Sequence, residues 1–296
     1  MTGLGDAGVL RVDKPAGPTS HDVVARARRA LGIRRIGHTG TLDPFASGLL
    51  LLCIGPATRL AEYLTGLDKS YTATALLGQA TETDDLEGEV IRVSEQWQGL
   101  ESSKIDDVLA GFVGDLNQVP PAYSAKKVAG ERMYRRARRG ETVELDPVLV
   151  RVEEARVVSV DLPHVHFELR CSSGTYVRAI ARDLGEALGC GAHLTALRRT
   201  RIGPFDVAQA VSGDALSDEG AMRTAWLTPA ESLGHMPTLH VDSDDAERIV
   251  HGQAIEAPDG QLPKKGPVAL LHDQTLLCVA ERTGDRLRPR KVFAGD

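Results

Sequence analysis

The sequence has no long hydrophobic run and no obvious export signal. Its longest apolar stretch, residues 48–54, is far shorter than the roughly 20 residues that a membrane-spanning helix needs. The first residues do not combine a basic segment with an apolar one, so we expect no secretion signal. These absences predict a cytoplasmic protein without a membrane span.

Cysteines and cofactor-binding motifs are also scarce. The four cysteines (Cys53, Cys171, Cys190 and Cys278) form no CxxC pair, which argues against a structural zinc site and a disulfide framework. We expect them to be reduced, core-filling residues. There is no GxxxxGK[ST] phosphate loop and no GxSxG nucleophile motif, and the GxGxxG at residues 3–8 follows no predicted strand. His164 and His166 lack a third ligand at a suitable spacing. The sequence therefore predicts neither a cofactor nor a metal.

The distribution of charge is more informative than its sum. A net charge of −6 would count against a nucleic-acid partner. The basic residues, however, gather at 26–35, 126–139 and 198–201, whereas acidic residues gather at 81–89 and 242–247. Segregated basic patches can bind a polyanion locally, although each cluster could instead be a solvated helix face.

The hydrophobic pattern predicts a mixture of strands and helices. Strands are expected at 9–12, 70–77, 89–93, 149–158, 165–171 and 192–202, and helices at 21–31, 57–64, 102–112 and 176–188. Thr19 or Ser20 can cap the first helix and Gly32 can end it. Residues 48–54 fit a buried strand or helix. After residue 236 we expect a helix at 243–250 followed by a hairpin and a last strand, the pattern of a small β-barrel.

Residues 35–47 hold a dense group of polar residues in a turn-rich segment that precedes the apolar stretch. Loops supported by buried elements often carry catalytic groups. Asp43 precedes Pro44, which restricts the backbone of Asp43 to extended conformations. From composition alone, the alternative is that this carboxylate only caps the following turn or helix.

Four stretches resemble the TruB family of tRNA pseudouridine-55 synthases. GHTGTLDPFASGLLLLCIGPATRL resembles the motif with the family's catalytic aspartate, here Asp43. The chain resembles three further motifs of the family, in the same order. These are DKPAGPTSHDVV, SYTATALLGQATETDDLEG and CSSGTYVRAIARDLG, and AHLTALRRTRIGPF follows the last of them. The resemblance covers residues 9–205, and the remainder is similar in outline to PUA-like RNA-binding tails.

The resemblance implies an α/β (α+β) fold. A catalytic domain on a mixed, largely antiparallel sheet would span residues 1–230, with a basic thumb-like insertion at 117–146, and a small PUA-like β-barrel would span 236–296. It implies isomerisation of a flipped-out uridine in the T arm of tRNA, without cofactor, metal or obligate protein partner, by a monomer.

The resemblance also assigns roles to individual residues. Asp43 would attack the sugar or abstract a sugar proton, and the sequence leaves both routes open. Arg178 would be its counter-ion, and Tyr71 would stack on the uracil. Tyr176 and Leu197 would complete the pocket, with core packing as the alternative for Leu197. His38 would occupy the space that the flipped base vacates, or would make a structural hydrogen bond. Lys14 would support the loop. The RNA phosphates would be contacted by Lys126, Lys127, Arg132, Arg135, Arg136, Arg138 and Arg139.

Three alternatives differ from this interpretation in testable ways. A non-catalytic RNA-binding protein would not need the set Asp43, Tyr71 and Arg178. A guide-directed synthase would need protein partners, and the low-complexity or Lys-rich tail of such relatives is absent from this sequence. A small-molecule glycosidase would need a second carboxylate paired with Asp43.

Overall fold

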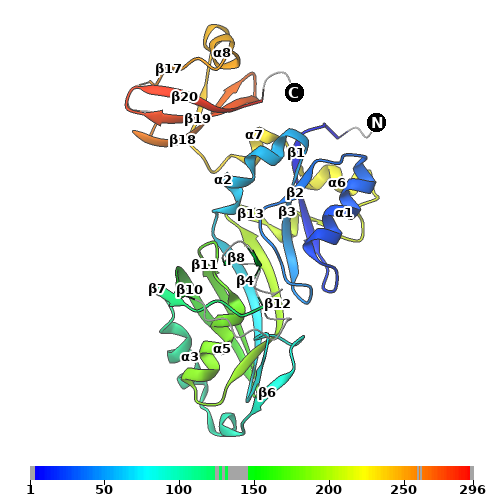
Figure 1. Cartoon of the computed structure of the whole chain (residues 1–296), viewed down its shortest axis with the longest axis vertical. Helices are drawn as coiled ribbons and strands as arrows, with labels where there is room; N and C mark the ends of the chain where they lie inside the picture. Colours follow the sequence, from blue (N-terminus) through cyan, green and yellow to red (C-terminus); the bar gives the residue numbers. More distant parts are fainter. Residues whose placement is uncertain are drawn as a thin grey trace. The chain divides into compact units, whose positions relative to one another are not determined.

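The computed structural model describes residues 4–123, 127–128, 131–132, 146–258, 260 and 262–293. The chain forms two compact units, each made of segments that are far apart in the sequence, as the colours in Figure 1 show. The first unit contains Met1–Leu42, Leu49–Thr65 and Gly203–Asp296, and the second contains Asp43–Gly48 and Gly66–Ile202. Asp43 therefore belongs to the second unit.

A sheet and one amphipathic helix form the N-terminal core of the first unit. The sheet strands are β1 (Gly8–Lys14), β2 (Ile36–His38), β3 (Ser47–Ile54), β14 (Val211–Ser212) and β15 (Trp226–Leu227). Helix α1 (Ser20–Leu31) begins after Thr19, which forms a capping box with Asp22, and ends at the left-handed Gly32. Its buried face packs with Leu10 and Leu50 in one apolar cluster. The remaining elements here are η1 (Gly55–Leu60), α2 (Ala61–Thr65), β13 (Phe205–Asp206), η3 (Val207–Gln209), α6 (Glu219–Ala225) and α7 (Pro229–Ser232).

The C-terminal part of the first unit is a small β module. Its five-stranded sheet has the order β16-β18-β19-β20-β17, antiparallel except where β16 runs parallel to β18. Helix α8 contributes Ala246 and Ile249 to the module's own apolar cluster. The elements are β16 (Thr238–His240), α8 (Ser243–Val250), β17 (Ile255–Glu256), β18 (Lys265–His272), β19 (Thr275–Thr283) and β20 (Arg286–Val292).

The second unit is built on five antiparallel strands. Their order is β12 (Ala192–Ile202), β4 (Lys69–Leu77), β11 (His164–Cys171), β10 (Val148–Asp161) and β7 (Gly114–Gln118). Buried residues alternate along β11, as expected for a strand with one face in the core. The other elements are β5 (Gln79–Thr81), β6 (Val90–Val93), η2 (Gln96–Gly99), α3 (Ser102–Ala110), β8 (Lys127–Val128), β9 (Glu131–Arg132) and α5 (Val177–Ala187).

A close backbone approach fixes the segment that follows Asp43. Ser47 and Gly48, the first residues of β3, pair in parallel with Arg198 and Arg199 of β12. Gly48 has φ of +106°, and a Cβ atom there would lie 2.2 Å from the carbonyl oxygen of Arg199. Only glycine tolerates this conformation and this approach. The turn that carries Asp43 is thereby held at the edge of β12.

The structure confirms the α/β fold and most of the predicted elements. Residues 48–54 are a strand and not a helix. The helix predicted at 57–64 is partly wrong, because residues 55–60 form a 3₁₀ helix with Pro56 in its first turn. No helix within the described residues is long and apolar enough to cross a membrane. The predicted division into domains at residues 230–236 stays a prediction.

Candidate active site

Asp43 begins a tight turn and points its carboxylate at a buried arginine. The N–H of Ala46 donates to the carbonyl of Asp43 (3.1 Å), and Pro44 occupies the second turn position, where proline is favoured. The side chain, for which turn capping was the alternative, contacts Arg178. Arg178 Nε donates to Asp43 Oδ2 (3.0 Å) and Nη2 donates to Oδ1 (3.3 Å). A two-point contact of this kind fixes the orientation of the carboxylate.

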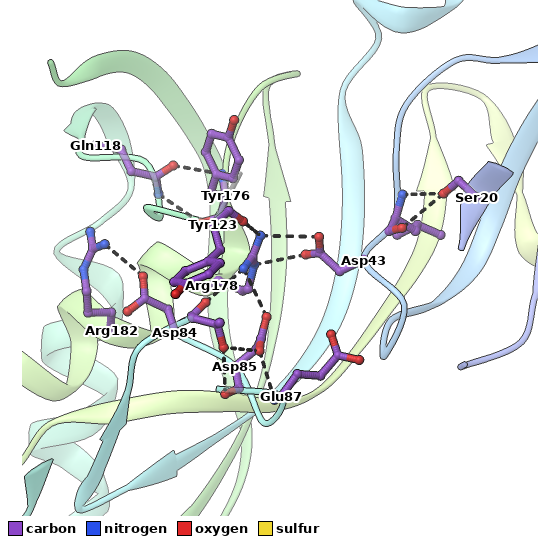
Figure 2. Close-up of polar contacts among 12 residues, drawn as sticks. Ser20, Asp43, Asp84, Asp85, Glu87, Gln118, Tyr123, Tyr176, Arg178 and Arg182 are labelled. Atoms are coloured by element: carbon purple, nitrogen blue, oxygen red, sulfur yellow. Dashed lines mark hydrogen bonds and ion pairs between the residues drawn. The ribbon is translucent and has the colours of Figure 1, made fainter. Parts of the chain in front are cut away.

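All five N–H groups of Arg178 have an acceptor. Besides Asp43, Nη1 donates to the carbonyl of Thr83 (2.9 Å) and to Asp85 Oδ2 (3.1 Å), and Nη2 donates to the carbonyl of Tyr123 (3.0 Å). A guanidinium has five N–H donors in a planar arrangement, so this set engages every one. Figure 2 shows the guanidinium at the centre of these contacts. Arg178 is therefore locked in one position.

One cation lies between two carboxylates that differ in exposure. The Asp85 side chain is 3% exposed and the Asp43 side chain is 34% exposed. Asp85 Oδ1 also accepts from the Thr83 hydroxyl and from the N–H of Glu87 (3.0 Å). A β-bridge to Leu194 of β12 fixes the Asp85 loop further. Of the two carboxylates that contact Arg178, Asp43 is therefore the one that solvent reaches.

A second ion pair repeats this arrangement one helical turn later. Arg182, four residues after Arg178 on α5, donates from Nη1 to Asp84 Oδ2 (3.0 Å) and from Nη2 to the carbonyl of Val119 (2.9 Å). Burial raises the pKa of Asp84 to about 6, although the charges of Arg182 and Arg178 oppose the rise. Two consecutive aspartates are therefore paired with two arginines on one helix face.

Tyr71 and Leu197 lie on one face of the β4–β12 pair. Tyr71 is opposite Arg199, and Leu197 is opposite Ala73, so Tyr71 and Leu197 are diagonal neighbours. Both are buried. Burial raises the pKa of the Tyr71 phenol, and the charge of Arg199, together with a hydrogen bond from it, opposes this rise. The charge of Asp43 adds to the rise.

Comparison with known proteins now identifies the family. Residues 28–177 match the model of the N-terminal domain of TruB family pseudouridylate synthases. The chain belongs to this family. Residues 178–233 match the C-terminal domain of tRNA pseudouridylate synthase B, and the two matches meet within helix α5. The chain is thus an RNA pseudouridine synthase, an isomerase.

Full-length relatives and solved structures agree with the family. A tRNA pseudouridine synthase B of Thermobifida fusca is 46% identical over 97% of this chain and 99% of its own length. One of Burkholderia lata is 45% identical over 96% of this chain and 89% of its own length. A Cbf5–Nop10–Gar1 complex matches 97% of this chain and 85% of the compared chain, with 26% identity and a TM-score of 0.75. The archaeal box H/ACA Nop10–Cbf5 complex matches with a TM-score of 0.74. Both structural matches cover 97% of this chain, which includes the small C-terminal β module.

The other predicted site residues of this TruB-family chain occupy different places. Tyr176 is the residue from which α5 starts, in the second unit with Asp43, Tyr71, Arg178 and Leu197. Lys14 and His38 belong to the first unit. Lys14 is buried, and its ammonium donates to the carbonyls of Pro15 (2.9 Å) and Pro18 (2.8 Å), the contacts of a loop support. His38 Nδ1 accepts from the N–H of Gly40 (3.3 Å).

The predicted RNA-binding insertion lies largely outside the described residues. Lys127 and Arg132 are opposite each other on the paired strands β8 and β9. The other five members lie outside the described residues, namely Lys126, Arg135, Arg136, Arg138 and Arg139. The phosphate-binding role of this set stays a prediction.

Some members of three charged clusters have structural roles. The cluster at 198–201 is not a uniform surface patch, because Arg199 is 2% exposed and faces Tyr71. In the cluster at 26–35, Arg28 donates to the carbonyl of Ile36 (2.9 Å) and Arg35 donates to the Thr58 hydroxyl (2.8 Å). These arginines therefore have structural partners. In the acidic run at 81–89, Asp84 and Asp85 are part of the site.

Three residues of the site were not predicted from the sequence. Asp84 and Asp85 stand in the motif that carries Tyr71, and their adjacency was a usable signal. Gln118, which precedes a Pro-Pro pair, contacts the main chain of Tyr176.

The described residues contain no group of three or more His, Cys, Asp or Glu that could hold a metal. All four cysteines are buried and unpaired with one another, as predicted.

Proposed function

We propose that this TruB-family enzyme converts uridine 55 in the T loop of tRNA to pseudouridine, with Asp43 as its catalytic carboxylate. The curated relatives that match nearly the whole chain are named tRNA pseudouridine synthase B, and this supports tRNA as the substrate. A base inside a folded arm must leave the stack before its atoms can be reached, so the proposal includes base flipping.

The reaction rearranges the nucleotide without net oxidation. The N1–C1′ bond breaks, the uracil rotates, C5 bonds to C1′, and the C5 proton leaves while N1 gains one. Asp43 either attacks the sugar or abstracts a sugar proton, and both routes require an ionised carboxylate. No electron carrier is needed, so we propose that the enzyme acts without a cofactor or metal.

The observation that carries the proposal is the two-point contact between buried Arg178 and partly exposed Asp43. A carboxylate that leaves water loses stability in its ionised form unless a cation is near. Arg178, itself held by Thr83, Asp85 and Tyr123, supplies that cation before any ligand binds. The charge is thus preorganised, which is where much catalytic stabilisation arises. Tyr71 and Leu197 supply an apolar face against which a flipped uracil can stack.

RNA recognition is proposed to use the rest of the chain. The cations at 126–139 suit phosphate contacts, which position an RNA without reading its bases. We propose that the module after residue 236 is a PUA-like domain that contributes to the same binding. A folded T arm would be recognised mainly by its shape and its unstacked bases. The proposed enzyme acts as a monomer without an obligate protein partner.

A modification assay tests this function. Purified enzyme is incubated with unmodified tRNA transcript, and pseudouridine is mapped at single-nucleotide resolution. Asp43→Asn keeps the shape of the side chain and should retain RNA binding but lose isomerisation. Asp161→Asn, at an exposed aspartate of the same unit, is the control and should behave like wild type. Turnover of Asp43→Asn within about tenfold of wild type, about 1.4 kcal/mol of barrier, would remove Asp43 from its role.

A further inference from the structure

Helix α5 carries Arg178 and begins directly after Tyr176, whose side chain does not cap the helix. The starting residue, Tyr176, has an extended backbone (φ −97°, ψ 106°), and its phenol makes no capping hydrogen bond. The first N–H groups of a helix have no partner within the helix and need acceptors from elsewhere. The position of this helix start decides where Arg178, two residues later, presents its guanidinium.

The missing partner comes from strand β7. The side-chain oxygen of Gln118 accepts from the N–H of Tyr176 (2.8 Å), and its Nε2 donates to the carbonyl of Tyr176 (3.1 Å). Gln118 is 1% exposed. One amide thus binds both main-chain polar groups of a single residue, with the acceptor in the place that an N3 side chain takes in a capping box. Figure 2 shows Gln118 bound to Tyr176 in this way.

Two further contacts hold the chain after Gln118 along the same helix. Arg182 donates to the carbonyl of Val119, and Arg178 donates to the carbonyl of Tyr123. The two arginines are four residues apart and share one helix face. Residues 118–123 are therefore attached to α5 at its start and at its first two turns, and the last attachment uses the guanidinium that holds Asp43.

We propose that Gln118 is a positioning residue for the isomerisation: its amide fixes the start of α5 and thereby sets Arg178 against Asp43. This inference rests on the proposed function of Asp43 and Arg178. Because Gln118 does not contact Asp43, its effect should appear in the chemical step and not in RNA affinity. Small misplacements of a catalytic group can reduce a rate by about a hundredfold.

The test compares three variants by single-turnover rate at saturating tRNA and by tRNA affinity. Gln118→Leu keeps the side-chain volume and removes both hydrogen bonds; we expect a rate at least about tenfold lower with affinity within about threefold of wild type. Gln118→Glu restores the acceptor but places a second acceptor against the Tyr176 carbonyl. Its rate relative to wild type should recover as the pH falls, because a protonated carboxyl donates again. Gln98→Leu, the same change at an exposed glutamine of η2, is the control and should match wild type.

Amide hydrogen exchange provides a readout that is independent of activity. The N–H of Tyr176 should exchange faster in Gln118→Leu than in wild type, while the amides of β11 should be unchanged. If Gln118→Leu fails to fold, the pH dependence of Gln118→Glu still decides. A Gln118→Leu enzyme at the wild-type rate, with Asp43→Asn inactive, would overturn the positioning role and leave the proposed function standing. An active Asp43→Asn enzyme would instead remove the catalytic role of Asp43, on which this inference rests.

Discussion

Replacing Arg178 by methionine should destabilise the protein mainly through Asp85 and not through Asp43. Methionine keeps most of the side-chain volume and removes the charge. Asp43 is partly exposed and can be solvated, but Asp85 is 3% exposed and would be left as a buried charge without its cation. Breaking a buried pair in this way costs about 3 to 5 kcal/mol.

A second substitution should return part of that stability. In Arg178→Met/Asp85→Asn the buried negative charge is gone, and the asparagine oxygen can still accept from the Thr83 hydroxyl and the Glu87 N–H. We expect the double variant to be about 2 kcal/mol more stable than Arg178→Met, since an unsatisfied buried group costs about 1 to 3 kcal/mol and a charge costs more. Catalysis should not return, because Asp43 still lacks its cation.

Urea unfolding of the four members of this cycle, with single-turnover assays, measures both effects. The exposed pair between Arg156 and Glu168 (2.8 Å) lies in the same unit and is the control. Arg156→Met should cost at most about 1 kcal/mol. A double variant no more stable than Arg178→Met would refute the reasoning that the uncompensated charge of Asp85 destabilises the single variant.

Three other predictions concern charge and metals. Burial, assisted by Arg199, lowers the pKa of Lys69 to about 8, so the folded state binds fewer protons than the unfolded state between about pH 8 and 10.5. The free energy of unfolding should therefore rise with pH across that window. Lys69→Met should abolish the rise and stabilise the protein at pH 7 by about 1 to 3 kcal/mol in thermal or urea unfolding. An unchanged pH profile in Lys69→Met would contradict this prediction. Replacing Arg135, Arg136, Arg138 and Arg139 with Gln should lower the log–log salt slope of tRNA binding by about 0.7 to 0.9 for each phosphate that is no longer neutralised. The single-turnover rate at saturating tRNA should change much less. An unchanged slope in a folded quadruple variant would show a solvated surface. Chelator treatment should leave turnover unchanged, and inactivation that added metal reverses would disprove metal-independent catalysis.

The sequence predicts local structure well where local chemistry decides it. The Thr19 cap and the Gly32 end of α1 follow from side-chain capping and the left-handed conformation of glycine. The alternation along β4 and β11 predicts their strands because one face is buried. The Asp43–Arg178 pair was inferred from the family resemblance, and the structure shows the contact. No local pattern joins residues 135 positions apart.

The features that the sequence did not predict are non-local. Asp84 and Asp85 look like solvated charges in an acidic run, and only the fold brings Arg178 and Arg182 to them. Gln118 belongs to no periodic hydrophobic pattern in the sequence, and its hydrogen-bond partners are main-chain atoms 58 residues away. Arg199 reads as a member of a basic patch, yet cross-strand pairing turns it toward Tyr71. In each case a tertiary contact overrides the expectation from composition.

The partners of Arg178 also have an order in time. Asp43, the loop at residues 83–85 and Tyr123 all precede Arg178 in the chain, and Arg182 follows it by one turn. Chains are synthesised from the N-terminus, and their parts fold as units when enough sequence has emerged. A nascent chain on the ribosome therefore cannot assemble this network until helix α5 has left the exit tunnel. All the contacts of the network lie in the second unit, so the network can be complete before residues 203–296 of the first unit are synthesised.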